Sequence, residues 1–179
     1  MKKEILLLCI IVGLLAQANS QSSISSLEQQ LKTAKGESKY EILYKLSKSY
    51  LQVSSKKSIE YGEDAFKLAK KLDSKSKQAD VLNLIGTAYF NEKNYRQAVK
   101  NYEKEHEIRK ELKQTTSSIK TLFNIGAIYE SWGKKNKAIE AYSEVLKSSN
   151  QYKNMALSSQ CYIRLIYLYS ERKDYKDGF

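Results

Sequence analysis

Two stretches of this chain recur forty residues apart, and this repeat restricts the possible folds more than any other feature. Residues 82–89 and 122–129 read LNLIGTAY and LFNIGAIY. Residues 95–102 and 135–142 read YRQAVKNY and KNKAIEAY, at the same separation. Self-similarity at a period of 20–50 residues is the signature of stacked repeat architectures, in which each unit buries its apolar face against the next. The sequence therefore predicts an array of similar units.

Each unit is predicted to be a pair of amphipathic helices. Apolar residues follow one another at steps of three and four in the first half of a unit, which is helical spacing; they are Val81, Leu84, Ile85, Ala88 and Tyr89. A polar turn follows, and Asn94 with Gln97 forms a capping-box pattern at the start of the next helix. Proline is absent and only seven glycines occur, which favours long helices. We expect an all-α fold, a right-handed α-solenoid of antiparallel helix pairs.

The glycines at equivalent positions need a structural reason. A glycine inside a helix costs about 1 kcal/mol relative to alanine. Gly86 and Gly126 both lie within predicted helices, so we expect a neighbouring helix to approach closely there, with Ala98 and Ala138 as the small residues on the second helices.

This pattern resembles the tetratricopeptide repeat, whose first helix carries a large residue, Leu-Gly and Tyr, and whose second carries Ala and then Phe or Tyr. The matching residues are Leu82, Ile85, Gly86, Tyr89, Ala98 and Tyr102, then Leu122, Ile125, Gly126, Tyr129, Ala138 and Tyr142. The first unit departs from it, with Ser47 and Ser58 in place of glycine and alanine. The family's late alanine is Glu105 and Val145 here. We expect an N-terminal helix at 21–37 and an array at 38–179, with units at about 40–73, 79–112, 119–152 and an incomplete 159–179.

The first twenty residues read as a secretory signal peptide. Lys2 and Lys3 precede an apolar run from Ile5 to Ala16, and small or polar residues follow it. This run is shorter than the roughly 20 residues of a membrane-spanning helix. Cleavage after Ala18 and cleavage after Ser20 both fit, and an uncleaved anchor is the alternative. We therefore expect an exported, periplasmic or otherwise extracytoplasmic protein.

A narrower resemblance concerns the residues after that leader. Residues 26–47 look like the opening of extracytoplasmic repeat regions in Bacteroidota signalling proteins of the sensor histidine kinase and regulator type. This resemblance implies a sensory or interaction region. The last unit stops after Asp174–Phe179, so we expect either a truncated piece of a longer protein or an exposed end that a partner or a second copy covers. Membrane contact is expected only through an uncleaved leader or a missing downstream segment.

The formal net charge of +11 raises the question of whether the chain binds nucleic acid. Because the lysines are spread along the chain and export is expected, we expect solvated helix faces and no nucleic-acid partner.

The sequence also contains no motif that indicates an enzyme. His106 is the only histidine and is expected on a solvated helix surface, and Cys161 is expected in the core. We expect no catalytic residue, no metal and no cofactor.

Stacked repeats of this kind curve, and their first helices line the concave side. The register places aromatic, amide and charged side chains there, a mixture that suits an extended peptide. The expected binding residues are Tyr44, Lys48, Asn83, Thr87, Phe90, Asn91, Phe123, Asn124, Glu130, Arg164 and Tyr167. Among these, Asn83, Asn124 and Arg164 are expected to matter more to binding than to folding. We therefore expect a non-catalytic extracytoplasmic module that binds a protein or peptide in a signalling system. The alternative is a free-standing envelope scaffold or assembly adaptor that uses the convex face or the exposed end.

Overall fold

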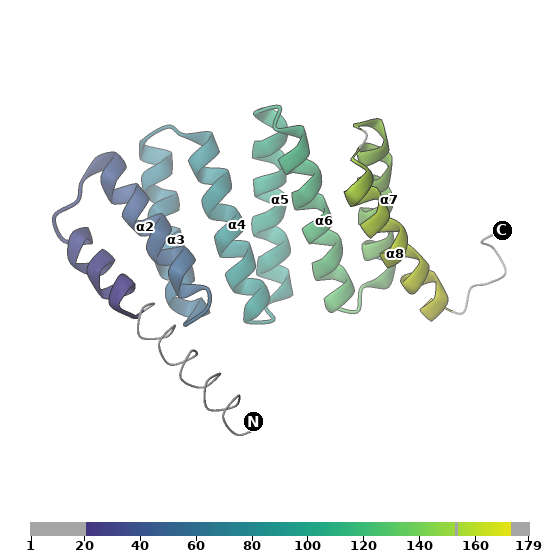
Figure 1. Cartoon of the computed structure of the whole chain (residues 1–179), viewed down its shortest axis with the longest axis horizontal. Helices are drawn as coiled ribbons and strands as arrows, with labels where there is room; N and C mark the ends of the chain where they lie inside the picture. The colour runs from purple at the N-terminus through teal and green to yellow at the C-terminus, as the bar shows by residue number, and fades with distance from the viewer. Residues whose placement is uncertain (1–20, 153, 173–179) are drawn as a thin grey trace, which may run out of the picture.

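The computed structural model describes residues 21–152 and 154–172, and this part of the chain is a row of helices without a strand (Figure 1). Residues 21–31 are helical. They are followed by α2 (Gly36–Tyr50), α3 (Ser55–Lys71), α4 (Lys75–Asn91), α5 (Tyr95–Glu111), α6 (Thr115–Ser131), α7 (Lys135–Gln151) and α8 (Met155–Arg172). The expected leader at 1–20 and the expected start of a helix at 174–179 lie outside the described residues.

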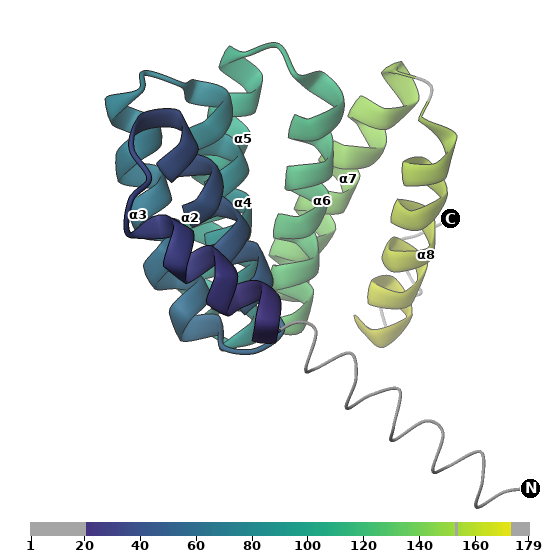
Figure 2. The ribbon, with the colours of Figure 1, turned by 60° about the vertical axis from the view of Figure 1, so that its left-hand side comes forward.

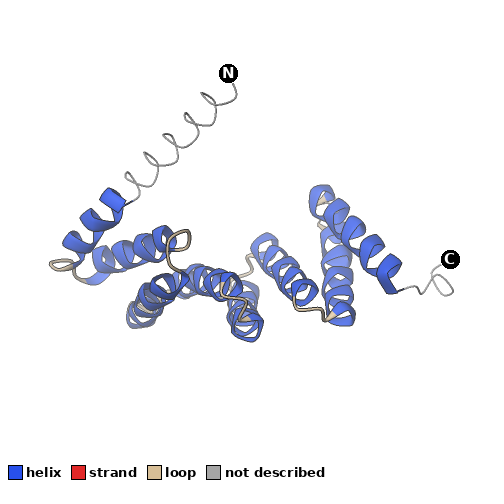
Figure 3. Ribbon diagram, turned by 90° about the horizontal axis from the view of Figure 1, so that it is seen from below, coloured by secondary structure: helices blue, strands red, loops and turns tan. Residues whose placement is uncertain are grey.

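The helices form antiparallel pairs in two layers. The first helices α2, α4, α6 and α8 lie toward the viewer in Figure 1, and the second helices α3, α5 and α7 lie behind them. Seen from below in Figure 3, the row of pairs bends. Each helix packs mainly on its neighbours in sequence, as in a solenoid. The expected all-α repeat fold is confirmed.

The four turns from α3 to α7 share one geometry, repeated every twenty residues. Asp73, Lys93, Lys113 and Gly133 each stand in the middle of a three-residue turn with positive φ, from 52° to 74°. In the turn after α4, the Lys93 N–H donates to the carbonyl of Phe90, and the Asn94 N–H donates to that of Tyr89. This is the Schellman pattern, which satisfies the last carbonyls of a helix. The Asn94 side chain then accepts the N–H of Gln97, so the predicted N-cap is confirmed.

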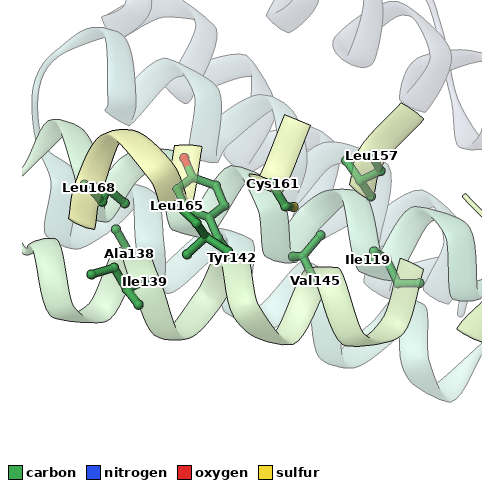
Figure 4. Close-up of a cluster of buried hydrophobic side chains, with 9 residues drawn as sticks. All are labelled: Ile119, Ala138, Ile139, Tyr142, Val145, Leu157, Cys161, Leu165 and Leu168. Atoms are coloured by element: carbon green, nitrogen blue, oxygen red, sulfur yellow. The ribbon is translucent and has the colours of Figure 1, made fainter. Parts of the chain in front are cut away.

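The core is a series of clusters between successive helices. Figure 4 shows the cluster between α6, α7 and α8, in which Tyr142, Val145, Cys161 and Leu168 are almost fully buried. Tyr142 and Cys161 each expose 0% of their surface, so the expected core position of Cys161 is confirmed. Figure 2 shows helical segment 21–31 beside α2, where Ile24 packs in a cluster with Ile42 and Leu46.

Gly86 and Gly126 each make room for a tyrosine ring from the second helix of the same unit. A Cβ atom added at Gly86 would lie 2.8 Å from the ring of Tyr102, and one at Gly126 would lie 2.8 Å from the ring of Tyr142. The expected close approach is therefore present. The nearest atoms belong to these large rings, and the expected small residues Ala98 and Ala138 are fully buried in the same clusters.

In the first unit the glycine of this facing pair lies on the second helix, and the larger residue lies on the first helix. Ser47 replaces the glycine, and Gly62 on α3 replaces the tyrosine. A Cβ atom added at Gly62 would lie 2.7 Å from the Cγ1 of Ile85 on α4 and 3.1 Å from the Ser47 Oγ. Ser47 and Ser58 also donate to each other's carbonyl oxygens, at 2.8 and 2.7 Å. In all three complete units, one member of the facing pair is glycine.

The helix bounds differ from the expected unit bounds at their starts. The first helices begin at residues 36, 75, 115 and 155, four residues before each expected unit. Gly36 therefore belongs to α2 and not to the N-terminal helical segment, which ends at residue 31. α2 has 15 residues where α4 has 17, and the turn after it is one residue longer, which accounts for the single residue missing from the first unit. No helix in the described ranges is long and apolar enough to cross a membrane.

Candidate binding surface on the first helices

The predicted binding residues lie on four adjacent first helices, a surface that we call the first-helix face. Thr87, Phe123 and Asn124 are half-buried, while Lys48, Asn91, Arg164 and Tyr167 are exposed. The Asn91 Nδ2 donates to the carbonyl of Leu51 at 3.5 Å, and this bond joins α4 to the end of α2. The set is brought onto neighbouring helices, but several of its members already bond within the chain.

The buried tyrosines reach this face through the space above the glycines. The Thr87 Oγ1 donates to the Asn83 carbonyl at 2.9 Å, so the Tyr102 hydroxyl, 2.7 Å away, donates to Thr87. One unit later, the Tyr142 hydroxyl donates to a carboxylate oxygen of Glu130 at 2.8 Å. These bonds tie residues of the first-helix face to core side chains.

Glu130 also binds across to the next first helix. The Arg164 Nη1 lies 3.2 Å from the other carboxylate oxygen of Glu130, and this ion pair joins α8 to α6. The Glu130 side chain exposes 17% of its surface and that of Arg164 exposes 52%. Because Arg164 is largely solvated, the ion pair contributes little stability, and a ligand can compete for the guanidinium.

Asn83 has a partner that the sequence did not predict. Its Nδ2 donates at 3.0 Å to Glu105, a buried carboxylate on α5 that exposes 3% of its surface. The Nε of Arg109 lies 3.4 Å from the other Glu105 oxygen. Arg109 also donates to Gln114 and pairs with Asp80. Asn83 is therefore part of a buried polar network, so its replacement is expected to affect stability as well as binding.

The Glu105 carboxyl is perturbed by its surroundings. Burial raises the pKa of Glu105, and the bonds from Asn83 and Arg109 partly oppose that rise. One sequence signal pointed to this site. Glu105 stands where the repeat pattern has alanine and where the third unit has Val145, so an ionisable group at a core position is visible in the alignment. Its partner Asn83 is not, because it comes from another helix, α4, whereas Arg109 lies four residues further along α5 itself.

Aromatic side chains of the face pack on one another and on the second helices. Phe90 lies 6.0 Å from Tyr95 between ring centroids, and Phe123 lies 5.2 Å from Tyr142. Tyr44 stacks on Tyr40 at 6.1 Å. These three face rings are half-buried, so each presents only part of its surface to an incoming ligand.

Four hollows in the described surface lie off the first-helix face. One lies between α3 and α5, floored by α4; Phe66, Ile85 and Tyr89 are among its apolar lining, and Lys100 and Lys104 stand at its edge. Another lies between α5 and α7 and includes His106 and Ser118. These two hollows separate consecutive second helices, on the opposite side from the predicted surface.

His106 was expected to be solvated, and this was wrong. Its Nδ1 lies 2.9 Å from the carbonyl of Ser118 and 3.0 Å from the Ser118 hydroxyl, and the ring is half-buried between α5 and α6.

Burial raises the pKa of the Cys161 thiol to about 11, which keeps it protonated and unreactive. Over residues 21–152 and 154–172, no group of three or more His, Cys, Asp and Glu residues is placed to hold a metal ion.

Comparison with known proteins matches the middle of the chain to a repeat family. Residues 77–151 match the tetratricopeptide repeat. This stretch runs from the third residue of α4 to the end of α7 and contains the two units with glycine and tyrosine at equivalent positions. A search of curated proteins found no match.

Several solved structures share the fold at low sequence identity. Aspartyl phosphate phosphatase F from Bacillus subtilis is 18% identical, with a TM-score of 0.74 over 87% of this chain and 44% of that protein. A signal-transduction ATPase with a tetratricopeptide repeat sensor, from Pyrococcus horikoshii, is 22% identical, with a TM-score of 0.78 over 90% and 25%. A Rap protein complexed with competence and sporulation factor is 17% identical, with a TM-score of 0.67 over 90% and 46%.

The chain thus spans less than half the length of each of these three proteins, and the likeness concerns the fold. The repeat match and the stacked helix pairs agree on the same segment. Residues 77–151 accordingly match the tetratricopeptide repeat, and the described residues share the all-α repeat fold of these solved structures.

Proposed function

We propose that this chain is a non-catalytic, extracytoplasmic module that binds a protein or an extended peptide on its first-helix face, as the input of a signalling system. The supporting observation is that four neighbouring helices present partly exposed rings, amides and a largely solvated guanidinium. Asn91, Asn124 and Arg164 contribute the polar groups, and Phe123 and Tyr167 contribute the rings. Amides bond to a peptide backbone, and rings form pockets for its side chains. Tetratricopeptide repeats generally serve as interaction scaffolds.

Site-specific photo-crosslinking tests where the partner binds. A photoreactive phenylalanine analogue is placed at Lys48 or Asn124 on the first-helix face, and at Lys56 or Lys100 as matched exposed positions on second helices. We expect one partner, identified by mass spectrometry, to be crosslinked from positions 48 and 124 and not from positions 56 and 100. A partner captured only from the second helices would contradict the proposal.

A second candidate function is an envelope scaffold or assembly adaptor that binds through its convex face or its exposed end, and two observations favour it. Hollows separate consecutive second helices, and α8 exposes large apolar side chains at the end of the array. The same crosslinking series, extended to Ser159 on α8, distinguishes the two functions. Crosslinking from positions 56, 100 or 159 alone would favour the scaffold.

Export is tested by the N-terminus of the mature protein. If residues 1–20 are a cleaved leader, the protein recovered from the cell envelope begins at Asn19 or at Gln21. Replacing Leu7 and Leu8 with lysine should keep the chain in the cytoplasm with Met1 in place, because the apolar run is broken. The same replacement at Ser22 and Ser23 is the control and should leave processing unchanged. A wild-type envelope protein that retains residues 1–20 would identify an uncleaved anchor.

A further inference from the structure

The turns inside the repeat units lie together along one edge of the helix row. They connect the first helix of a unit to its second helix, at residues 51–54, 92–94 and 132–134, and they lie along the lower side in Figure 1. The view from below in Figure 3 looks at this edge. We call these turns, together with the first three residues of the second helix that follows each of them, the turn edge. The turns between units lie along the opposite edge.

The turn edge carries positive charge that is mostly not neutralised within the described chain. Its seven cations are Lys56, Lys57, Lys93, Arg96, Lys134, Lys135 and Lys137. Glu92 is the only acidic residue of the turn edge. Of the seven cations, only Lys135 forms an ion pair with a described carboxylate, that of Glu171. On the opposite edge, in contrast, Lys75 and Lys77 are both held in ion pairs.

Exposed apolar side chains stand among these cations. Three turns of the described chain expose a large hydrophobic side chain, and two of these residues, Val53 and Trp132, are on the turn edge. Val53 exposes 54% of its surface and Trp132 exposes 38%. The Trp132 ring stacks beside that of Tyr129, with 6.3 Å between centroids, and the Lys134 Nζ lies 5.6 Å from its centroid. The indole is therefore held by its neighbours, while part of it stays open to solvent.

This combination of side chains suits an anionic membrane surface. Each lysine or arginine near such a surface strengthens binding about fivefold, which corresponds to about 1 kcal/mol. Tryptophan prefers the level of the lipid headgroups, and a lysine stem can lie along apolar groups while its ammonium reaches the phosphates. A soluble polyanion would account for the cations, but it would not account for the exposed valine and indole between them.

We propose that the turn edge binds an anionic lipid surface, with Val53 and Trp132 at the level of the headgroups and the cations against the lipid phosphates. Because the three turns come from successive units in one row, they can contact one surface together. The helices then rise from the membrane, and both the first-helix face and the second helices stay open to other partners. This inference depends neither on the leader nor on the first-helix face.

Trp132 is the only tryptophan of the chain and reports on this contact directly. The full-length protein is mixed with vesicles of phosphatidylcholine that contain about one third phosphatidylglycerol. We expect the emission of Trp132 to shift to the blue and to be quenched by lipids with brominated acyl chains. The matched variant Trp132→Phe/Tyr152→Trp carries its tryptophan in the turn after α7, on the opposite edge, and should show neither effect. A chain held only by its leader would leave Trp132 unquenched, which would overturn the proposal.

Paired charge variants test the role of the cations. Lys56→Gln/Lys93→Gln removes two exposed cations from the turn edge and should weaken binding to the same vesicles about 25-fold, fivefold for each cation. Lys71→Gln/Lys113→Gln removes the same charge at the other ends of α3 and α5 and should change binding less than about twofold. Cosedimentation with the vesicles gives the affinities, and circular dichroism verifies that each variant is folded.

Several results would contradict a lipid contact at the turn edge. They are equal quenching of tryptophan at positions 132 and 152, and an equal loss of vesicle binding in both charge variants. Heparin that shifts the emission of Trp132 when vesicles do not would also contradict it, because a soluble polyanion would then be the ligand of this edge.

Discussion

Gly126→Leu is expected to lower the free energy of unfolding by about 3 kcal/mol, the upper part of the range for overpacked cores. The reason is geometric. Even a Cβ atom at this position would lie 2.8 Å from the ring of Tyr142, which is fully buried and cannot move aside without disturbing α7 and α8. The gain in helix propensity, about 1 kcal/mol, is smaller than this clash. Urea denaturation measures the change.

The adjacent residue supplies the control. Ala127→Leu adds a similar side chain one position along α6, on the half-exposed first-helix face, and should change stability by no more than about 0.5 kcal/mol. Tyr142→Ala should be costly in the wild type, about 3 kcal/mol, and much less so in Gly126→Leu, because it removes the ring that clashes. If the two substitutions prove additive, the ring does not occupy the space above Gly126.

Arg109→Met is expected to cost about 3 kcal/mol, because it leaves the Glu105 carboxylate buried without its cation. Arg109 exposes 11% of its side chain and Glu105 only 3%, so water cannot replace the guanidinium freely. The double variant Glu105→Val/Arg109→Met should recover most of this loss, since the third unit carries Val145 at the same position. A double-mutant cycle in urea gives the coupling. A double variant less stable than Arg109→Met alone would show that Glu105 is not the reason for the cost.

The same pair predicts a pH dependence with a definite sign. The pKa of Glu105 is raised in the folded state, chiefly by burial, above an unfolded value of about 4.3. Its contribution to stability is therefore complete below pH 4.3 and is lost as the pH rises through the folded pKa. Arg109→Met removes an attraction that lowers this pKa, so its cost should shrink in acid, where Glu105 is protonated. Glu105→Gln should abolish that part of the pH dependence.

Much of the fold follows from short-range patterns in the sequence. The steps of three and four define an apolar side on each helix, and the forty-residue period requires the units to stack alike. Asn94 marks a helix start that the structure reproduces. The turn conformations could not be predicted in this way, because Asp73, Lys93 and Lys113 adopt positive φ without being glycine. The hydrogen bonds of the Schellman pattern hold that conformation, and lysine or aspartate at these positions does not predict it.

The partners of the polar residues depended on the tertiary structure. Sequence alone determined that this chain builds a helical repeat array, that two glycines mark close approaches and that Glu105 is an unusual residue at a core position. Only the packed helices decided that Asn83 donates to Glu105, that tyrosine rings fill the space above the glycines, and that Ile166 is exposed. Periodicity specifies which side of a helix is apolar, whereas the side chain that meets a given residue depends on how far one helix is shifted and rotated against another.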